Sequence, residues 1–224
     1  MKKFVDQLGP TITAMIGLSF TQGYFPASHK HAIVRPHLEK PSLDPLDLKS
    51  YRPISNLSFI SKLTERLVVD RFNNYARAYH LLPAKQSAYR QYHSTVTAIT
   101  KVHNDIVRAI HAGNVSVLVL LDISSAFDTV DHDVLLDVLR KRFGVVIKAF
   151  DWCKSYLSER TPSFCVASET SNPVNLTCSV PQGSVIGPVK FIAYIEDIAK
   201  TVDAFRINHH LYADDTQLQD QLIV

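Results

Sequence analysis

The segment Tyr212-Ala213-Asp214-Asp215 places two adjacent carboxylates between apolar and alternating stretches of the chain. The largely apolar residues 204–207 and the segment His209-His210-Leu211 precede it, and residues 216–218 resume an alternating pattern, so the segment is predicted to be the turn of a β-hairpin. If the fold encloses this turn, the two like charges lose hydration and repel each other unless a cation compensates them. Mg²⁺ is the expected cation, because it binds carboxylate oxygens and completes its shell with substrate phosphates. For these four residues alone, a solvated surface turn is the alternative.

A third carboxylate follows an almost wholly apolar stretch. Val115–Leu121 reads VSVLVLL, a composition typical of a central strand that is covered on both faces. Asp122 comes directly after it, where a charge either reaches solvent or serves a site. Residues 180–188 (VPQGSVIGP) form a loop in which Gly183 allows close approach of a ligand, and the loop leads into a helix that starts at Pro188.

The other elements are predicted from the spacing of apolar residues and from Gly, Pro and capping residues. Helical spacing predicts two short helices in residues 1–21, separated at Gly9-Pro10, and a longer helix from Ser58 or Ser61 to Pro83. Strand fragments and loop are expected over residues 22–53, further helices over residues 94–113, 134–144, 147–157 and 188–198, and a second hairpin from residues 161–166 and 174–178.

Length and composition limit the class of protein. With 224 residues and 46% hydrophobic residues, the chain can build one core, or a core with an attached lobe, but not several independent domains. Three cysteines without a Cys-x-x-Cys spacing and no signal peptide predict a reduced intracellular setting, in either nucleus or cytoplasm. No apolar run approaches the roughly 20 residues of a membrane-spanning helix, so no membrane partner is expected.

The net charge of +3 is unevenly distributed along the chain. Residues 1–112 contain 15 Lys and Arg against 7 Asp and Glu (+8), whereas residues 113–224 contain 9 against 14 (−5). A basic half joined to an acidic half is typical of a protein that binds a polyanion with one part and metal ions with the other. Chance asymmetry on a solvated surface is the alternative.

Five motifs follow one another in the order found in one protein family. With them, the chain resembles the reverse transcriptase domain of LINE-type (non-long-terminal-repeat) retrotransposons over nearly its whole length. Five motifs in the correct order are highly specific, and they favour a functional site over a surface turn. The motifs are Tyr51-Arg52-Pro53-Ile54-Ser55, Gln86-Ser87-Ala88-Tyr89-Arg90 with Ser94-Thr95, Leu121-Asp122-Ile123-Ser124-Ser125-Ala126-Phe127-Asp128, Val180-Pro181-Gln182-Gly183-Ser184 and Tyr212-Ala213-Asp214-Asp215.

The resemblance implies an α+β fold of the right-hand polymerase type, with fingers and a palm whose antiparallel sheet packs on helices. The chain stops at Val224, so the thumb, the later palm segments and the endonuclease of such elements are expected to be absent or supplied in trans. The implied parts of this partial domain (1–224) are an N-terminal extension (1–50), fingers-like segments (51–112 and about 145–178) and palm segments (113–144 and 179–224).

The resemblance also implies a two-metal site. Joining a nucleotide to a primer is an in-line phosphoryl transfer, in which two Mg²⁺ about 3.5–4 Å apart activate the primer 3′-hydroxyl and stabilise the departing pyrophosphate. Mn²⁺ is an alternative ion. Asp122 and Asp214 bridge both ions in this arrangement, and Asp215 lies closer to the primer-side ion or supports its shell. The carbonyl of Ile123 is an additional oxygen ligand.

Further residues are assigned by the resemblance to the nucleotide and the primer. Phe127 matches the family's steric gate beneath the incoming sugar, and Gln182 and Gly183 match the loop that touches nucleotide and template. The family binds the triphosphate with basic residues of the fingers, although for each such residue a solvated charge is the alternative. The triphosphate candidates are Arg52, Lys62 and Arg90, and the primer-side candidates are Tyr212 and Ala213.

The favoured function is an RNA-directed DNA polymerase domain, with an RNA template, a DNA primer and deoxynucleoside triphosphates as partners. The second hypothesis is a catalytically inactive nucleic-acid-binding relic of a retrotransposon, which the missing thumb favours and the three intact aspartates disfavour. A two-metal nuclease leaves the Pro-Gln-Gly loop and Phe127 unexplained. The chain departs from the family at Ser179, where glycine is usual, and at Lys190, which replaces an apolar residue and is expected at the margin of its helix.

Overall fold

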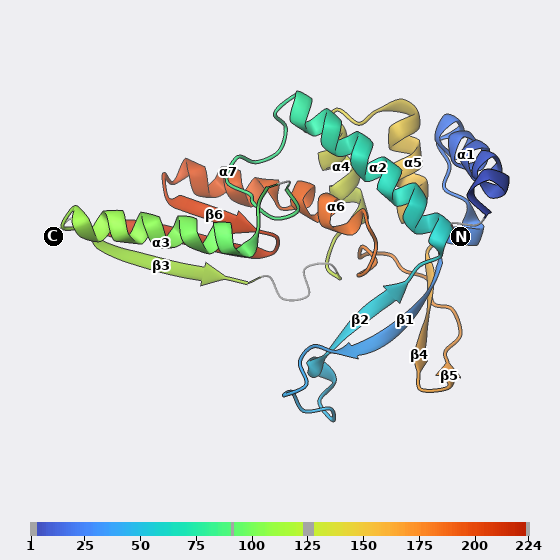
Figure 1. Cartoon of the computed structure of the whole chain (residues 1–224), viewed down its shortest axis with the longest axis horizontal. Coiled ribbons are helices and arrows are strands. Elements are labelled where there is room, and N and C mark those ends of the chain that lie inside the picture. Colours follow the sequence, from blue (N-terminus) through green and yellow to red (C-terminus); the bar gives the residue numbers. More distant parts are fainter. Residues whose placement is uncertain (1–3, 91, 123–127, 223–224) are drawn as a thin grey trace. The chain divides into compact units, whose positions relative to one another are not determined.

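The structure is a computed structural model that describes residues 4–90, 92–122 and 128–222. The described residues form an α+β fold of helices and strands, as expected (Figure 1). They cluster into two compact units. Unit 1 comprises residues 1–75 and 127–187, and unit 2 comprises residues 76–126 and 188–224. The division into fingers and palm segments stays a prediction.

Strand β1 (His31–Leu38) lies inside the sheet of unit 1. It pairs antiparallel with β2 (Tyr51–Asn56) and parallel with β4 (Thr161–Val166), which pairs with β5 (Glu169–Thr170), so the order is β2-β1-β4-β5. Pro36 lies beyond the part of β1 that pairs with β4, so its missing N–H removes no bond to that strand. Two short 3₁₀ helices, η2 (Ala27–His29) and η3 (Leu48–Ser50), flank this region.

The second hairpin differs from its prediction in the position of its turn. Strand β5 begins at Glu169, whereas the return strand was expected over residues 174–178. Ala167 adopts φ +54, which closes a tighter turn directly after β4. The expected return segment still runs beside β4, because the Val174 N–H donates to the Pro162 carbonyl at 2.9 Å.

Helix α1 (Val5–Gln22) is one helix, so the prediction of two short helices is wrong. Pro10 lies inside it and removes one backbone N–H. The later turns pack against α5 (Ile147–Leu157) and bury Ile16, so tertiary packing stabilises the helix across the proline.

Helix α2 (Phe59–Ala78) has Ser58 as its N-cap, because the Ser58 hydroxyl accepts from the Ser61 N–H at 3.1 Å. Together with α4 (His132–Lys141) and α5 it completes the helices of unit 1. The core of the unit contains a cluster of aromatic rings: Trp152 stacks on Tyr156, and Phe25 contacts both edge-on at centroid distances of 5.5 and 5.1 Å.

Unit 2 contains an antiparallel sheet with helices packed on it, as expected for a palm. Its strands are β3 (Val115–Leu121), β6 (Asn208–Tyr212) and β7 (Asp215–Leu222), in the order β3-β7-β6. Helix α3 (Thr95–His111) contacts β3 and β6, and α7 (Glu196–Ala204) contacts β6. Helix α6 (Gly187–Tyr194) precedes α7. Helix α3 begins at the predicted position, and Ser94 and Thr97 form a capping box there.

Strand β3 was expected to be central and covered on both faces, and this expectation is wrong. In the described sheet β3 is an edge strand, because β7 lies between it and β6. Val119 is 44% exposed and Leu120 is 67% exposed. Composition alone does not distinguish the positions, because strand order depends on partners far along the chain. Lys190 also differs from expectation, since it is buried within α6 and not at the margin.

No helix among the described residues is both long and apolar enough to span a lipid bilayer.

Candidate active site

The predicted hairpin is formed by β6 and β7. Tyr212 pairs with Asp215, which leaves Ala213 and Asp214 as the two-residue turn. Ala213 is buried and has φ +54, a conformation that is uncommon for residues other than glycine. Asp214 is half-buried and Asp215 is exposed.

Strand β3 brings the third carboxylate to the same end of the sheet. Leu121 is the last residue of β3 and pairs with Thr216 of β7. Continuing this antiparallel register by one residue sets Asp122 opposite Asp215, directly after the turn. The sheet therefore gathers all three predicted catalytic aspartates at one end of unit 2.

The electrostatics of Asp215 agree with this arrangement. Although Asp215 is largely exposed, partial loss of hydration raises the pKa of its carboxyl above the usual value, and the nearby charges of Asp214 and Asp122 raise it further. Over residues 4–90, 92–122 and 128–222, however, no three His, Cys, Asp or Glu side chains converge tightly enough to enclose a metal ion. The three carboxylates are thus close enough to affect one another's charge, but in the described part of the chain their side chains do not converge on a single metal position.

The raised pKa of Asp215 predicts how pH acts on the protein without divalent ions. A folded-state pKa above the ordinary value of 3.8 means that the folded state binds this proton more tightly than the unfolded state. The resulting stabilisation is present below the unfolded-state pKa and is lost as pH rises through the folded-state pKa. We expect the melting temperature of the wild type, relative to Asp215→Asn, to fall as pH rises over this range. A flat or rising difference would contradict the close placement of the carboxylates.

A segment from the second motif forms a further edge beside β6. The Leu211 N–H donates to the Lys85 carbonyl at 3.0 Å, and the Ser87 N–H donates to the Leu211 carbonyl at 2.9 Å. These bonds make a parallel bridge between Gln86 and Leu211. The motif is thereby joined to the strand that leads into the Ala213-Asp214 turn.

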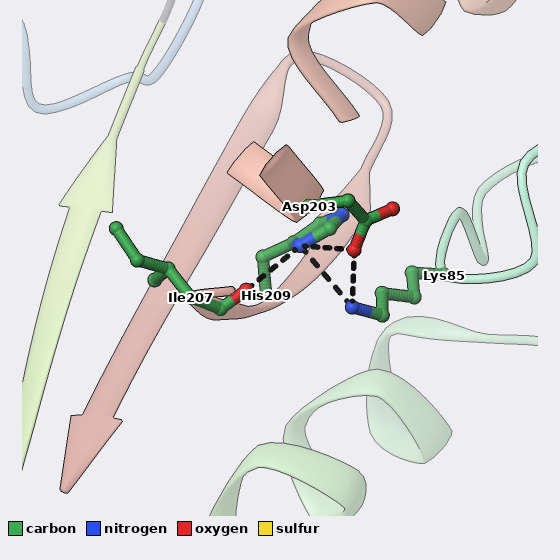
Figure 2. A network of polar contacts seen from close by, with 4 residues as sticks. All are labelled: Lys85, Asp203, Ile207 and His209. Atoms are coloured by element: carbon green, nitrogen blue, oxygen red, sulfur yellow. Dashed lines mark hydrogen bonds and ion pairs between the residues drawn. The ribbon is translucent and has the colours of Figure 1, made fainter. Parts of the chain in front are cut away.

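Polar contacts hold the beginning of this segment (Figure 2). The Lys85 ammonium donates to Asp203 of α7 at 2.8 Å, and His209 Nδ1 lies 3.4 Å from Lys85 Nζ and 3.7 Å from Asp203 Oδ1. The carbonyl of Ile207 lies 3.3 Å from the same ring nitrogen. The hydrogen bond from Lys85 lowers the pKa of Asp203. Together these contacts connect α7, β6 and the second motif.

The Pro-Gln-Gly loop lies in unit 1 and is fixed to the end of β2. The Ser55 N–H donates to the Gln182 carbonyl at 2.7 Å. Gly183 adopts φ +105, and a Cβ at this position would lie 2.9 Å from the Ser55 carbonyl oxygen. Only glycine therefore suits both the backbone conformation and the close approach. Two of the five motifs, at residues 51–55 and 180–184, are in contact.

Glu65 of α2 supports the same loop from the interior. Its side chain is fully buried and accepts from the hydroxyls of Ser61 and Tyr156 at 3.0 Å each. Its second oxygen accepts from the Val185 N–H at 2.6 Å. Burial and the charge of Glu65 strongly raise the pKa of Tyr156, which keeps that phenol protonated as a donor.

The other predicted site residues are distributed over both units. Arg52 forms an ion pair with Glu39 at 2.7 Å, and Lys62 is half-buried on α2; both belong to unit 1. Arg90 belongs to unit 2, donates to the Pro83 carbonyl at 2.6 Å, and has a pKa lowered by burial and by Arg77. Ile123 and Phe127 lie outside the described residues.

Comparison with known proteins decides the family. Residues 38–219, which include all five motifs, match the family described as reverse transcriptase (RNA-dependent DNA polymerase). The chain belongs to the reverse transcriptase family.

Curated reverse transcriptases from mobile elements are similar to the chain. It is 35% identical over 175 residues to the probable RNA-directed DNA polymerase from transposon BS of Drosophila melanogaster, with 78% of this chain and 19% of that protein covered. It is 32% identical over 199 residues to the RNA-directed DNA polymerase from the mobile element jockey of the same species, with 87% and 21% covered. The chain thus spans a small part of these relatives, and the expected LINE-type family is confirmed.

Solved telomerase structures share the reverse transcriptase fold. The apo telomerase of Candida tropicalis truncated from its C-terminal domain has a TM-score of 0.59 at 12% identity, covering 87% of this chain and 44% of that one. The telomerase of the same organism in complex with a fragment of telomeric RNA has a TM-score of 0.60 at 10% identity, covering 94% and 39%. At these identities the likeness concerns the fold.

Gln86 and Tyr89 belong to the second motif, but the sequence alone assigned no role to either residue. Tyr89 has φ +56, is 55% exposed, and has a pKa raised by partial burial and by the charges of Asp214 and Tyr212. Together with the hydrogen bonds between Gln86 and Ala213, this places Tyr89 near the Ala213-Asp214 turn. The motif itself was the available signal, since an aromatic residue next to a positive charge is typical of nucleic-acid contacts.

Proposed function

We propose that this chain provides the polymerising part of an RNA-directed DNA polymerase and transfers deoxynucleotides to a primer 3′-hydroxyl on an RNA template. The observation that carries the proposal is the register of unit 2, in which Asp122, Asp214 and Asp215 gather at one end of the β3-β7-β6 sheet. Membership of the reverse transcriptase family supports the same activity.

The carboxylates fit divalent ions by their chemistry. Three carboxylates lie on two separate backbone segments, Asp122 after β3 and Asp214-Asp215 in the hairpin. Loss of hydration and the charges of Asp214 and Asp122 raise the pKa of Asp215, so a hard cation would stabilise this donor set. Two Mg²⁺, or Mn²⁺, would supply activation of the 3′-hydroxyl and charge stabilisation at the departing pyrophosphate. In this proposal Asp122 and Asp214 would hold the ions, Asp215 would support the primer-side ion, and the Ile123 carbonyl would be a further ligand.

The nucleotide and the primer would use other residues of the motifs. Gln182 and Gly183 would contact the nucleotide and template in this proposal. Tyr212 and Ala213 face the primer, with Tyr89 as an additional aromatic contact on which a base can stack. The proposed ligands of the triphosphate are Arg52, Lys62 and Arg90.

A catalytically inactive nucleic-acid-binding relic is the second candidate. It is supported by the net charge of +8 over residues 1–112, which favours binding of a polyanion whether or not polymerisation occurs. With either function the chain would act inside the cell, in the nucleus or the cytoplasm. Polymerase or endonuclease segments on another chain could act together with it.

Primer extension on an RNA template distinguishes the two candidates. The polymerase predicts Mg²⁺-dependent elongation of a labelled DNA primer by the purified chain. The relic predicts binding of the primer–template, seen as a shift in an electrophoretic mobility assay, without elongation at any Mg²⁺ or Mn²⁺ concentration.

Sugar choice gives a further prediction. A site rejects the ribonucleotide 2′-hydroxyl most simply by placing bulk where that group would lie, and Phe127 has the bulk without a polar atom. Phe127→Val should raise the relative kcat/KM for ribonucleotides by about 10- to 100-fold while largely preserving deoxynucleotide incorporation. Parallel loss of both activities with a lower melting temperature would indicate a core aromatic and refute the steric gate.

A further inference from the structure

The buried side chain of Gln86 contacts the residue that precedes Asp214. Its Oε1 accepts from the Ala213 N–H at 3.2 Å and from the Ala88 N–H at 2.9 Å, and its Nε2 donates to the Ala213 carbonyl at 3.3 Å. Gln86 is 1% exposed. One amide therefore satisfies both backbone polar groups of Ala213.

Ala213 needs such support because of its conformation. A non-glycine residue at φ +54 is strained, and strained residues persist only where the surrounding structure determines them. The side chain at position 86 must supply an acceptor for the Ala213 N–H and a donor for the Ala213 carbonyl, both at the end of a chain as long as glutamine. The glutamate side chain has no donor at neutral pH, and the asparagine side chain is one methylene shorter. Methionine has no donor and only a weak acceptor, its thioether sulfur.

The position of Gln86 is itself fixed by backbone bonds. The bonds of Lys85 and Ser87 to Leu211 anchor the residues on both sides of it to β6, two residues before Ala213. The amide therefore projects from a rigid sheet edge and not from a free loop. A displacement of the turn would require breaking this edge or the side-chain bonds.

We propose that Gln86 is a positioning residue, which holds the Ala213–Asp214 turn in the conformation that presents the Asp214 carboxylate to divalent ions. This proposal rests on the proposed function for its metal and polymerase chemistry. Gln86 itself contacts no substrate; it acts through the backbone of Ala213.

The test compares Gln86→Met with Ser87→Ala. Methionine keeps the length and much of the volume of glutamine but removes the amide. Ser87 is the matched control, because it is also buried on the same segment and its hydroxyl lies 2.6 Å from His210 Nε2, away from the turn. Both variants lose a buried hydrogen-bonding group, so a merely structural role predicts similar behaviour.

Gln86→Met should bind Mn²⁺ about 10- to 100-fold more weakly than the wild type, as measured by electron paramagnetic resonance, because supporting partners of ligands have effects of this size. Its kcat for single-nucleotide addition should fall about 100-fold, with KM for the nucleotide changed much less, since small misplacements of reacting groups act on kcat. Ser87→Ala should change both quantities less than threefold, because the Ser87 hydroxyl contacts His210 and not the Ala213-Asp214 turn.

Equal Mn²⁺ affinities and equal kcat values in the two variants would overturn the proposal. If the wild type binds Mn²⁺ but does not polymerise, the proposed function fails, and the affinity difference still decides the role of Gln86. If the wild type does neither, amide hydrogen exchange of Ala213 decides it: faster exchange in Gln86→Met alone supports the positioning role, and unchanged exchange overturns it.

Discussion

Asp214→Asn is expected to bind Mg²⁺ or Mn²⁺ at least about 100-fold more weakly than the wild type, because loss of a direct ligand should exceed the effect of losing a supporting partner. Asp214 lies in the two-residue turn between β6 and β7, and the register of β3 brings Asp122 to the same end of the sheet. Asparagine keeps the size of the side chain and one oxygen but removes the charge. The loss of affinity should therefore occur without a large change in melting temperature.

Asp220→Asn is the matched control for this prediction. Asp220 is exposed on the same strand, β7, where it pairs with Val117, four residues along β3 from the pair at Leu121. The substitution removes the same charge from the same strand but away from the turn. Isothermal titration of both variants with Mn²⁺ measures the difference. Equal affinities in wild type and Asp214→Asn would remove the hairpin from the metal site.

Glu65→Ala is expected to lower the free energy of unfolding by about 3 kcal/mol. The substitution leaves the Ser61 hydroxyl, the Tyr156 hydroxyl and the Val185 N–H without their acceptor, and each unsatisfied buried donor costs about 1–3 kcal/mol. Removing a buried carboxylate recovers part of this cost, because its own desolvation disappears. Denaturant unfolding monitored by Trp152 fluorescence measures the change, since this ring stacks on Tyr156.

Glu39→Ala provides the contrast for Glu65. Glu39 forms its ion pair with Arg52 near the surface, where the Arg52 side chain is 60% exposed. Such pairs contribute about 0–1 kcal/mol, so Glu39→Ala should have little effect on unfolding. If both variants unfold at similar denaturant concentrations, the buried network around Glu65 does not stabilise unit 1.

Local patterns were sufficient to predict many elements of the fold. The alternation around Asp214 predicted the hairpin, Ser94 and Gly113 bounded α3, and the apolar run Val115–Leu121 predicted β3 with its own limits. These features depend on residues that are neighbours in the sequence. The helix at the N-terminus was wrongly divided at Pro10, because packing against α5 outweighed the local effect of the proline.

Contacts between distant residues could not be predicted in the same way. The edge position of β3 depends on β7, about a hundred residues later in the chain, and apolar composition is compatible with either position. Gln86 and Ala213 are 127 residues apart, and Glu65 and Val185 are 120 residues apart. For the site, the motifs identified the aspartates and the glycine loop, whereas the side chains that hold them became evident only from the fold.

Templated addition of a single nucleotide tests the central claim most directly. Four RNA templates that differ only in the base opposite the primer end are annealed to one labelled DNA primer and given each deoxynucleoside triphosphate in turn with Mg²⁺. The account predicts that each template selects its complementary nucleotide, that chelation of Mg²⁺ stops the addition, and that Asp214→Asn lowers its rate by about 1,000-fold, since loss of metal chemistry removes several kcal/mol of transition-state stabilisation. Addition that ignores the template base, or that proceeds equally in Asp214→Asn, would contradict it.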